Sequence, residues 1–96
     1  MLAAAVDRLE EASRQAAKER AREGARLASK AGLDAEGRSE ATEGSSWSAL
    51  NRIAETEDAL AVVVGSRGLS GLRQMLLGST SSGLLQHSAR PVVVVP

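Results

Sequence analysis

The feature that most constrains this chain is a run of three valines that leads into a loop punctuated by glycines. The valines are Val62 to Val64, and glycines follow at Gly65, Gly68 and Gly71. A β-branched run, a glycine-rich loop and then a row of small hydroxyl residues predict a strand, a tight turn and the start of a helix. The stretch therefore predicts a strand-loop-helix unit of an α/β fold.

The same stretch has the composition of a phosphate-binding loop. Because glycine has no Cβ, the backbone N–H groups beside it can turn inward and approach an anion closely. Ser79 to Ser82 add hydroxyls and the free amides of a helix N-terminus, where the positive end of the helix dipole lies. The alternative is that these hydroxyls serve only as helix caps. The two common phosphate motifs, GxxxxGK[ST] and GxGxxG, are both absent from the sequence.

The glycine spacing resembles the nucleotide motif of the universal stress protein family. Gly65, two residues, Gly68, nine residues and then Gly78-Ser79 reproduce the family pattern G-x2-G-x9-G-[ST], and the Arg-Pro-Val run near the end of the chain is similar too. The resemblance implies a stress-response module that binds an adenine nucleotide, ATP, with or without Mg²⁺. By this resemblance the nucleotide-binding residues are Gly65, Arg67, Gly68, Gly78, Ser79, Thr80 and Ser81.

Arg67 and Arg73 are the charged side chains nearest to this predicted site in the sequence. The planar fork of donors on Arg67 suits a triphosphate, and a solvated loop arginine fits the sequence equally well. Leucines and a methionine over residues 69–77 predict a short helical lid that covers the loop with apolar surface.

Composition limits the size of the fold and the class of partner. Ninety-six residues with 43% hydrophobic content form at most one small domain, residues 1–96, and its core is thin because most apolar residues are alanine and valine. A formal net charge of zero and the lack of a basic block argue against nucleic acid or an anionic membrane as partner. Without cysteine the chain has no disulfide and no cysteine-ligated zinc.

The sequence predicts binding without catalysis. His87 is the single histidine, which builds no metal site unaided and fits a helix C-terminus, so no metal site and no catalytic residue are predicted. Some members of the resembled family hydrolyse ATP slowly, but nothing here supplies a positioned base. No apolar run approaches the roughly 20 residues of a membrane span, and charges follow the apolar start at once, unlike a signal peptide. We predict a soluble, cytoplasmic protein.

The first third of the chain predicts one long helix. Apolar residues recur at three- and four-residue spacing from Leu2 to Ala31, and Gly32 is the expected stop. Its charges form either a partner surface or a solvated face, and their alternating signs favour the solvated face. The apolar stripe comprises Val6, Leu9, Ala12, Ala16, Ala21, Ala25 and Ala28, and the predicted ion pairs include Glu10 with Arg14 and Glu23 with Arg26.

The middle of the chain predicts a second helix and a buried strand. Asp34 to Gly44 fits an edge strand or a loop, since it has one β-branched residue and an internal glycine. Ser45 and Ser46 cap the helix that follows, and the acidic cluster Glu55, Glu57 and Asp58 fits a solvated turn better than a metal site. Ala59 to Val64 predict a parallel strand covered on both faces. The inward face of the helix is predicted as Trp47, Leu50, Ile53 and Ala54, with Trp47 as packing rather than a platform for ligand.

The end of the chain predicts a short helix and a final strand. Ser79 to about His87 fits a helix with Leu84 and Leu85 facing inward, and Val92 to Val95 fit a strand between two prolines. In the family that the chain resembles, the matching strand pairs antiparallel with its twin, so the resemblance implies a homodimer through Val92 to Val95. An unpaired valine edge would otherwise invite aggregation.

The resemblance also implies the fold class and a departure from it. The family domain has five parallel strands in the order 3-2-1-4-5, and an Asp-containing loop after its first strand contacts the nucleotide. This sequence begins at the helix before the third strand. The expected fold is therefore α/β, an incomplete doubly wound parallel sheet (adenine nucleotide alpha hydrolase-like) that lacks the first two strands of the family domain. A nucleotide held only by its phosphates would bind weakly.

Three functional hypotheses stay open on the sequence. The first is the ATP-binding stress-response module that the glycine motif implies. The second is a dimerisation or interaction module that needs no nucleotide. The third is a truncated and poorly folding fragment of a universal stress protein.

Overall fold

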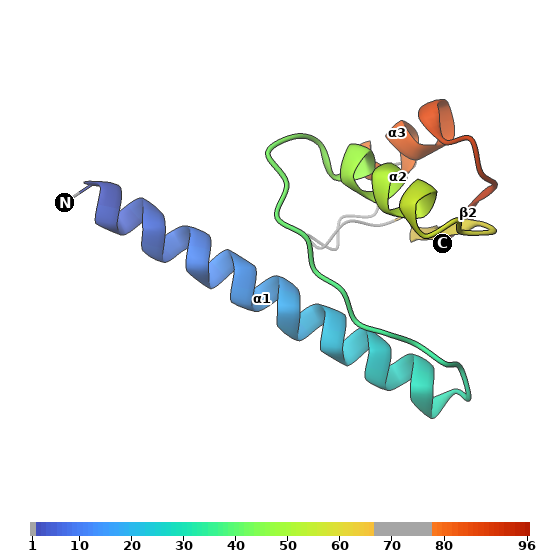
Figure 1. Ribbon diagram of the computed structural model, residues 1–96, viewed down its shortest axis with the longest axis horizontal. Coiled ribbons are helices and arrows are strands. Elements are labelled where there is room, and N and C mark those ends of the chain that lie inside the picture. The colour runs from blue at the N-terminus through green and yellow to red at the C-terminus, as the bar shows by residue number, and fades with distance from the viewer. Residues whose placement is uncertain (1, 67–77) are drawn as a thin grey trace. The chain divides into compact units, whose positions relative to one another are not determined.

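The computed structural model describes residues 2–66 and 78–96 (Figure 1). Contacts within the chain divide it into two compact units, Met1–Ala41 and Thr42–Pro96. The first contains helix α1 (Leu2–Lys30), and the second contains α2 (Ser46–Thr56), β1 (Val62–Gly65), α3 (Ser79–His87) and β2 (Val92–Val95), in that order. A single domain over residues 1–96 stays a prediction.

Helix α1 ends where the sequence predicts. Gly32 has a φ of 92°, its N–H donates to the carbonyl of Ser29 at 3.0 Å, and the N–H of Leu33 donates to that of Ala28 at 2.9 Å. This left-handed C-cap satisfies two of the last carbonyls of the helix, and glycine adopts it without steric cost. The last helical residue is Lys30, one position before the predicted end.

The segment after Gly32 is irregular and packs on α1. Residues 34–44 form no helix or strand. Of the two structures that the sequence allows, an edge strand or a loop, the segment is therefore a loop. A Cβ at Gly37 would lie 2.8 Å from the carbonyl oxygen of Ala21, which shows how closely the segment approaches the helix backbone. Alanines at 21, 25 and 28 are accordingly half-buried, whereas Leu2 and Leu9 at the other end of the predicted stripe are exposed.

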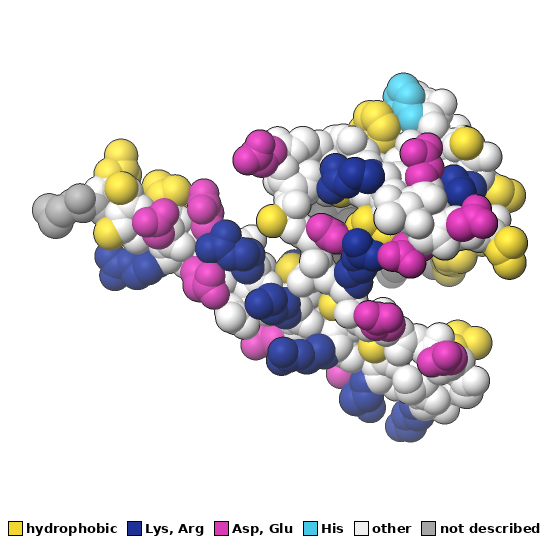
Figure 2. All heavy atoms as spheres, viewed as in Figure 1, with side chains coloured by type: hydrophobic (Ala, Val, Ile, Leu, Met, Phe, Trp, Pro, Cys, Tyr) yellow, Lys and Arg dark blue, Asp and Glu magenta, His cyan; other side chains and the backbone are white. Residues whose placement is uncertain are grey.

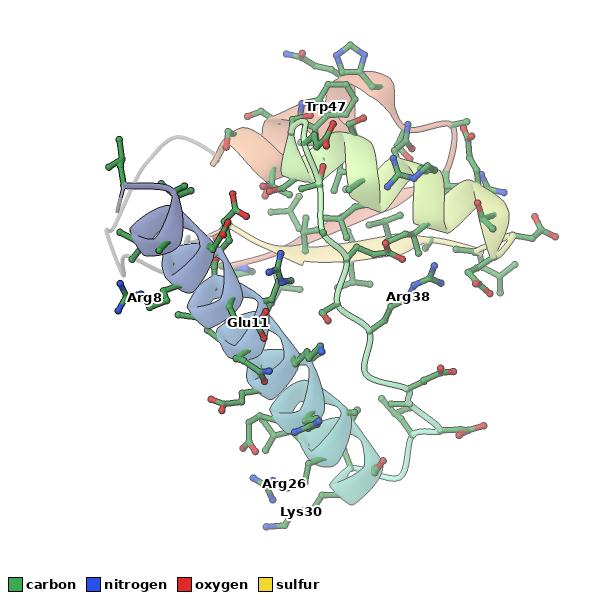
Figure 3. The ribbon with its side chains drawn as sticks, turned by 60° about the vertical axis from the view of Figure 1, so that its left-hand side comes forward. Arg8, Glu11, Arg26, Lys30, Arg38 and Trp47 are labelled. Carbon is green, nitrogen blue, oxygen red and sulfur yellow. The ribbon has the colours of Figure 1, made fainter. Side chains whose placement is uncertain are left out.

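Ion pairs on α1 follow a three-residue spacing. Arg26 and Glu23 lie 2.6 Å apart, as predicted, but Arg14 pairs with Glu11 at 3.0 Å, so its predicted pairing with Glu10 is wrong. A hydrogen bond from Gln15 and the guanidinium of Arg14 lower the pKa of Glu11, and the hydrogen bond from Arg26 lowers the pKa of Glu23. Basic and acidic side chains alternate along α1 (Figure 2), and Figure 3 labels Glu11 and Arg26 on its surface.

The two strands of the second unit form a parallel pair in which Val62 faces Val92 and Gly65 faces Val95. Parallel strands need a crossover between them, and α3 supplies it. The chain is therefore α/β, as predicted. Within the described residues this sheet has two strands, and the fuller doubly wound arrangement stays a prediction.

Strand β1 is shorter and more exposed than the sequence predicts. It begins at Val62 rather than Ala59, because the N–H of Ala59 is taken by the carbonyl of Ala54 at the end of α2 (2.9 Å). Leu60 is 93% exposed, and Val63 is 64% exposed between two half-buried valines. In Figures 1 and 3, α2 and α3 lie on the same side of the strands, and burial alternates along β1. Among the described residues of this unit, the predicted cover on both faces is therefore wrong for this strand.

The core of the second unit lies between α2 and α3. Leu84 is fully buried, and Ala49 and Ala54 are buried on α2. A Cβ at Gly83 would collide with the indole of Trp47, so the helices approach closely at this glycine. Trp47, labelled in Figure 3, also stacks on His87. The ring centroids are 4.4 Å apart, with 14° between the planes. The prediction that Trp47 is a packing residue is confirmed.

Two leucines predicted to face inward are exposed instead. Leu50 on α2 and Leu85 on α3 lie at the surface. Small residues, Ala49 and Gly83, form the contact faces of the two helices in their place. Close approach of the backbones therefore takes precedence over leucine burial at this contact.

Helix α2 has a serine cap and an unusual C-terminus. The hydroxyl of Ser45 accepts from the N–H of Ser48 at 3.4 Å, as the predicted cap requires. At the other end Asp58 adopts a φ of 50°, and Arg90 holds this turn by donating to the carbonyl of Ala59 (2.7 Å) and to Asp58 Oδ1 (3.1 Å). The acidic residues Glu55, Glu57 and Asp58 are exposed: Glu55 lies in the last turn of α2, and Glu57 and Asp58 form the turn after it.

None of the helices in residues 2–66 and 78–96 has the length and apolarity that a membrane span requires.

Candidate phosphate-binding site

Five of the seven predicted nucleotide-binding residues lie within the part of the chain that the structure describes. Gly65 ends β1, Gly78 precedes α3, and residues 79–81 form the first turn of α3. Arg67 and Gly68 lie outside the described residues, as does the predicted lid at residues 69–77. The described part of the site therefore consists of its two flanks, the end of β1 and the start of α3.

The first flank is the carboxyl end of β1. Gly65 is the last residue of the strand, and ligands of open α/β sheets bind beyond the carboxyl ends of such strands. The N–H of Ser66 donates to the carbonyl of Val95 at 2.8 Å, so β2 fixes the chain at the point where it leaves the sheet. The sequence analysis did not single out Ser66. Its position directly after the predicted strand is the feature that could have indicated its role.

The second flank is the amino end of α3. Gly78 is the N-cap residue, with φ −65° and ψ 167°, and it makes no side-chain cap. The first helical bond runs from the N–H of Ser82 to the carbonyl of Gly78 at 3.0 Å. The amides of Ser79, Thr80 and Ser81 precede that bond, in the turn where a helix has no acceptor of its own for its N–H groups.

The charge of this turn favours an anion. Helix α3 has no acidic residue in its first turn, and its one basic residue, His87, stands in the last turn. No carboxylate of this turn therefore competes with an anion for the free amides and the positive end of the helix dipole. A Cβ at Gly78 would meet no atom of residues 2–66 or 78–96 within 4 Å, so these residues leave the space beside the N-cap open.

A hydrogen bond joins the two flanks. The hydroxyl of Ser81 donates to the carbonyl of Gly65 at 3.0 Å, and the Ser81 side chain is 2% exposed. The structure thus brings Gly65 and the first turn of α3 together. Ser79 is exposed and Thr80 is half-buried, so Ser79 and Ser81, which the sequence treats alike, occupy opposite environments.

The described part of the site offers donors for an anion. Its described groups are backbone donors and hydroxyls, and no titratable side chain stands among residues 78–82. Throughout residues 2–66 and 78–96 no three His, Asp or Glu side chains gather as a metal site would need.

Comparison with known proteins identifies the family. Residues 1–96, the whole chain, match the model of the Universal stress protein family. The chain belongs to the universal stress protein family. It is similar to a universal stress protein of Mycolicibacterium smegmatis, with 52% identity over 40 residues, and to Universal stress protein YxiE of Bacillus subtilis, with 56% identity over 34 residues.

These matches cover short parts of both partners in each comparison. The aligned stretches span 42% and 35% of this universal stress protein, and 14% and 23% of the two relatives' own lengths. No solved structure gave a significant match. The resemblance inferred from the glycine motif is confirmed at the level of the family, and membership agrees with the α/β fold of the second unit.

Proposed function

We propose that this universal stress protein is a stress-response module that binds ATP by its phosphate chain, at the junction of β1 and α3. The observation that carries the proposal is the hydrogen bond from Ser81 to Gly65, because it sets the uncapped N-terminus of α3 beside the carboxyl end of a parallel strand. Backbone amides at such a place are a common means of holding phosphate.

The residues of the motif take different roles in this proposal. The amides of residues 79–81 and the exposed hydroxyl of Ser79 donate to phosphate oxygens, and Gly65 and Gly78 leave room for the phosphates to approach the backbone. Arg67 and Gly68 complete the motif in the sequence. Magnesium, where present, is held by the phosphates, since the described residues offer no ligand cluster for it.

The proposal is one of binding without catalysis. Hydrolysis of ATP needs a group that orients or deprotonates the attacking water. The described part of the site presents hydroxyls and amides, with no carboxylate or imidazole in the first turn of α3.

A glycine substitution tests the site with a matched control. At Gly78 and Gly44 an added Cβ meets no described atom within 4 Å and neither residue has a positive φ, so the two positions are matched for a valine substitution. We expect Gly78→Val to weaken Mg-ATP binding at least tenfold in isothermal titration calorimetry, because its side chain fills the approach to the amides. Gly44→Val, outside the site, keeps the affinity of the unchanged chain. Equal affinity of all three proteins would refute the proposed site.

A homodimer through Val92–Val95 is a second proposal. Strand β2 pairs with β1 on one edge, and its other edge has no strand partner among the described residues. Val93 and Val95 are also about half exposed, and an open apolar edge favours pairing with another chain. Sedimentation velocity from micromolar to millimolar protein should show a dimer, and a monomer at every concentration would remove this proposal.

A further inference from the structure

We propose that Ser81 is a positioning residue of the phosphate site rather than a phosphate ligand. Its buried hydroxyl fixes the Gly65-Ser66 peptide against the first turn of α3, and so sets the geometry in which the amides of the site meet a phosphate. The inference rests on the proposed nucleotide-binding function and assigns a different role to a residue that the glycine motif groups with the ligands.

Burial separates Ser81 from the other hydroxyls of the site. Within residues 2–66 and 78–96 it is the one polar residue that the fold buries. Its Oγ lies 3.0 Å from the carbonyl oxygen of Gly65, and no buried side-chain donor or acceptor in that part of the chain lacks a partner. The hydroxyl proton of Ser81 is therefore engaged within the protein, whereas the side chain of Ser79 faces solvent.

The bond from Ser81 completes the fixing of one peptide group. In a trans peptide the C=O and the following N–H point in opposite directions. The N–H of Ser66 donates to Val95 on β2, so the carbonyl of Gly65 points away from β2, to the side of β1 where the described residues offer no pairing strand. Ser81 donates to that carbonyl. The Gly65-Ser66 peptide is thus held by β2 on one side and by α3 on the other.

The two hydrogen bonds of the Gly65-Ser66 peptide link β1 to the first turn of α3, where the site lies. With both bonds present, this turn keeps one distance and orientation relative to the end of β1. Without the bond from Ser81, the carbonyl of Gly65 loses its donor, and the binding-competent arrangement becomes one of several. The apparent affinity then falls in proportion to the population of the competent state. Loss of Ser79, in contrast, removes one contact to phosphate and leaves the arrangement intact.

The test compares three substitutions in the full chain: Ser81→Ala, Ser81→Thr and Ser79→Ala. Calorimetric affinities for Mg-ATP and for magnesium tripolyphosphate are measured where each protein is folded, together with the ¹³C carbonyl shift of Gly65 in the ligand-free state. We expect Ser81→Ala to weaken both probes about tenfold and to move the Gly65 shift. Ser81→Thr, which keeps the hydroxyl, restores both. Ser79→Ala weakens binding without moving the Gly65 shift.

The outcomes separate this inference from the function on which it rests. If the unchanged chain binds neither probe, the proposed function is wrong and the inference is wrong with it. If the unchanged chain binds and Ser81→Ala binds equally well, only the inference is wrong. Weakened binding with an unmoved Gly65 shift makes Ser81 a ligand and also overturns the inference. Should Ser81→Ala fail to fold, Ser81→Cys, whose thiol is a weak donor, takes its place with smaller expected changes of the same sign.

Discussion

The two units of this chain obtain their order from different sources. The second unit buries Ala49, Ala54, Ser81 and Leu84 between elements that are distant in the sequence. Helix α1 of the first unit extends over 29 residues and buries none of them. It has a glycine C-cap and ion pairs one turn apart, and the segment around Gly37 packs on its backbone near Ala21. A site that needs fixed geometry is accordingly expected in the second unit, where the candidate site lies.

The largest expected effect breaks the tertiary contacts of the second unit. In Gly83→Ala the added methyl collides with the Trp47 indole, which must leave its place between the helices. We expect the free energy of unfolding to fall by about 3 kcal/mol, as for severe overpacking. Urea unfolding followed by the fluorescence of the single tryptophan measures it. Gly44→Ala, which meets nothing within 4 Å, is the control. Equal stability of the two variants would contradict the described contact.

A second prediction concerns the one buried hydroxyl. Ser81→Ala leaves the carbonyl of Gly65 without its donor, and an unsatisfied buried group costs about 2 kcal/mol. Ser79→Ala at the exposed start of the same helix should change stability by less than about 0.5 kcal/mol. Chemical denaturation of the two variants provides the comparison. A Ser81→Ala variant as stable as Ser79→Ala would show that the hydroxyl contributes nothing to the fold.

Two glycines of the first unit should respond with opposite signs. Gly24 lies inside α1 with open space around it, so Gly24→Ala should stabilise the helix by about 0.8 kcal/mol. Gly32 has a φ of 92°, where alanine is strained, so Gly32→Ala should destabilise by about 1 kcal/mol. Amide hydrogen exchange along α1 reports both changes. The same sign for both variants would contradict the local account of this helix.

The smallest effect is the response of α1 to acid. Glu11 and Glu23 have lowered pKa values in the folded chain, so their ion pairs stabilise above the ordinary glutamate pKa of about 4.3. This stabilisation is lost as the pH falls through the lowered values. Cα chemical shifts should show fraying of α1 in that range, and the double variant Glu11→Gln, Glu23→Gln should fray less steeply. Glu10→Gln, outside these pairs, should fray with falling pH as the unchanged chain does. If the double variant also frays like the unchanged chain, the two ion pairs do not stabilise α1.

Local rules in the sequence predicted the elements better than their contacts. The ends of α1, the Ser45 cap of α2 and the strand Val92–Val95 follow from periodicity, capping and proline placement. The start of β1 does not follow from these rules. The amide of Ala59 donates to the carbonyl of Ala54 at the end of α2, and the strand therefore begins later than its apolar residues predict. Leu50 and Leu85 were misplaced, because the close contact of Gly83 with Trp47 decides which side of each helix is buried.

The candidate site shows the same division. The glycine spacing located it, and comparison confirmed the family. The row of hydroxyls from Ser79 to Ser82 contains no local signal that separates one serine from another. The rotation of α3 about its axis makes that separation, since it turns Ser81 toward Gly65 and leaves Ser79 in solvent.

The most direct test of phosphate binding at this junction is thermal unfolding of the full chain with Mg-ATP or with adenosine at equal concentration. A ligand that binds only the folded state raises the midpoint, by an amount equivalent to about 1.4 kcal/mol at ten times its Kd. We expect a cooperative transition that Mg-ATP raises and adenosine leaves in place, because in the proposed site the amides of residues 79–81 bind the phosphates. A cooperative transition indifferent to Mg-ATP, or no transition at all, would contradict it.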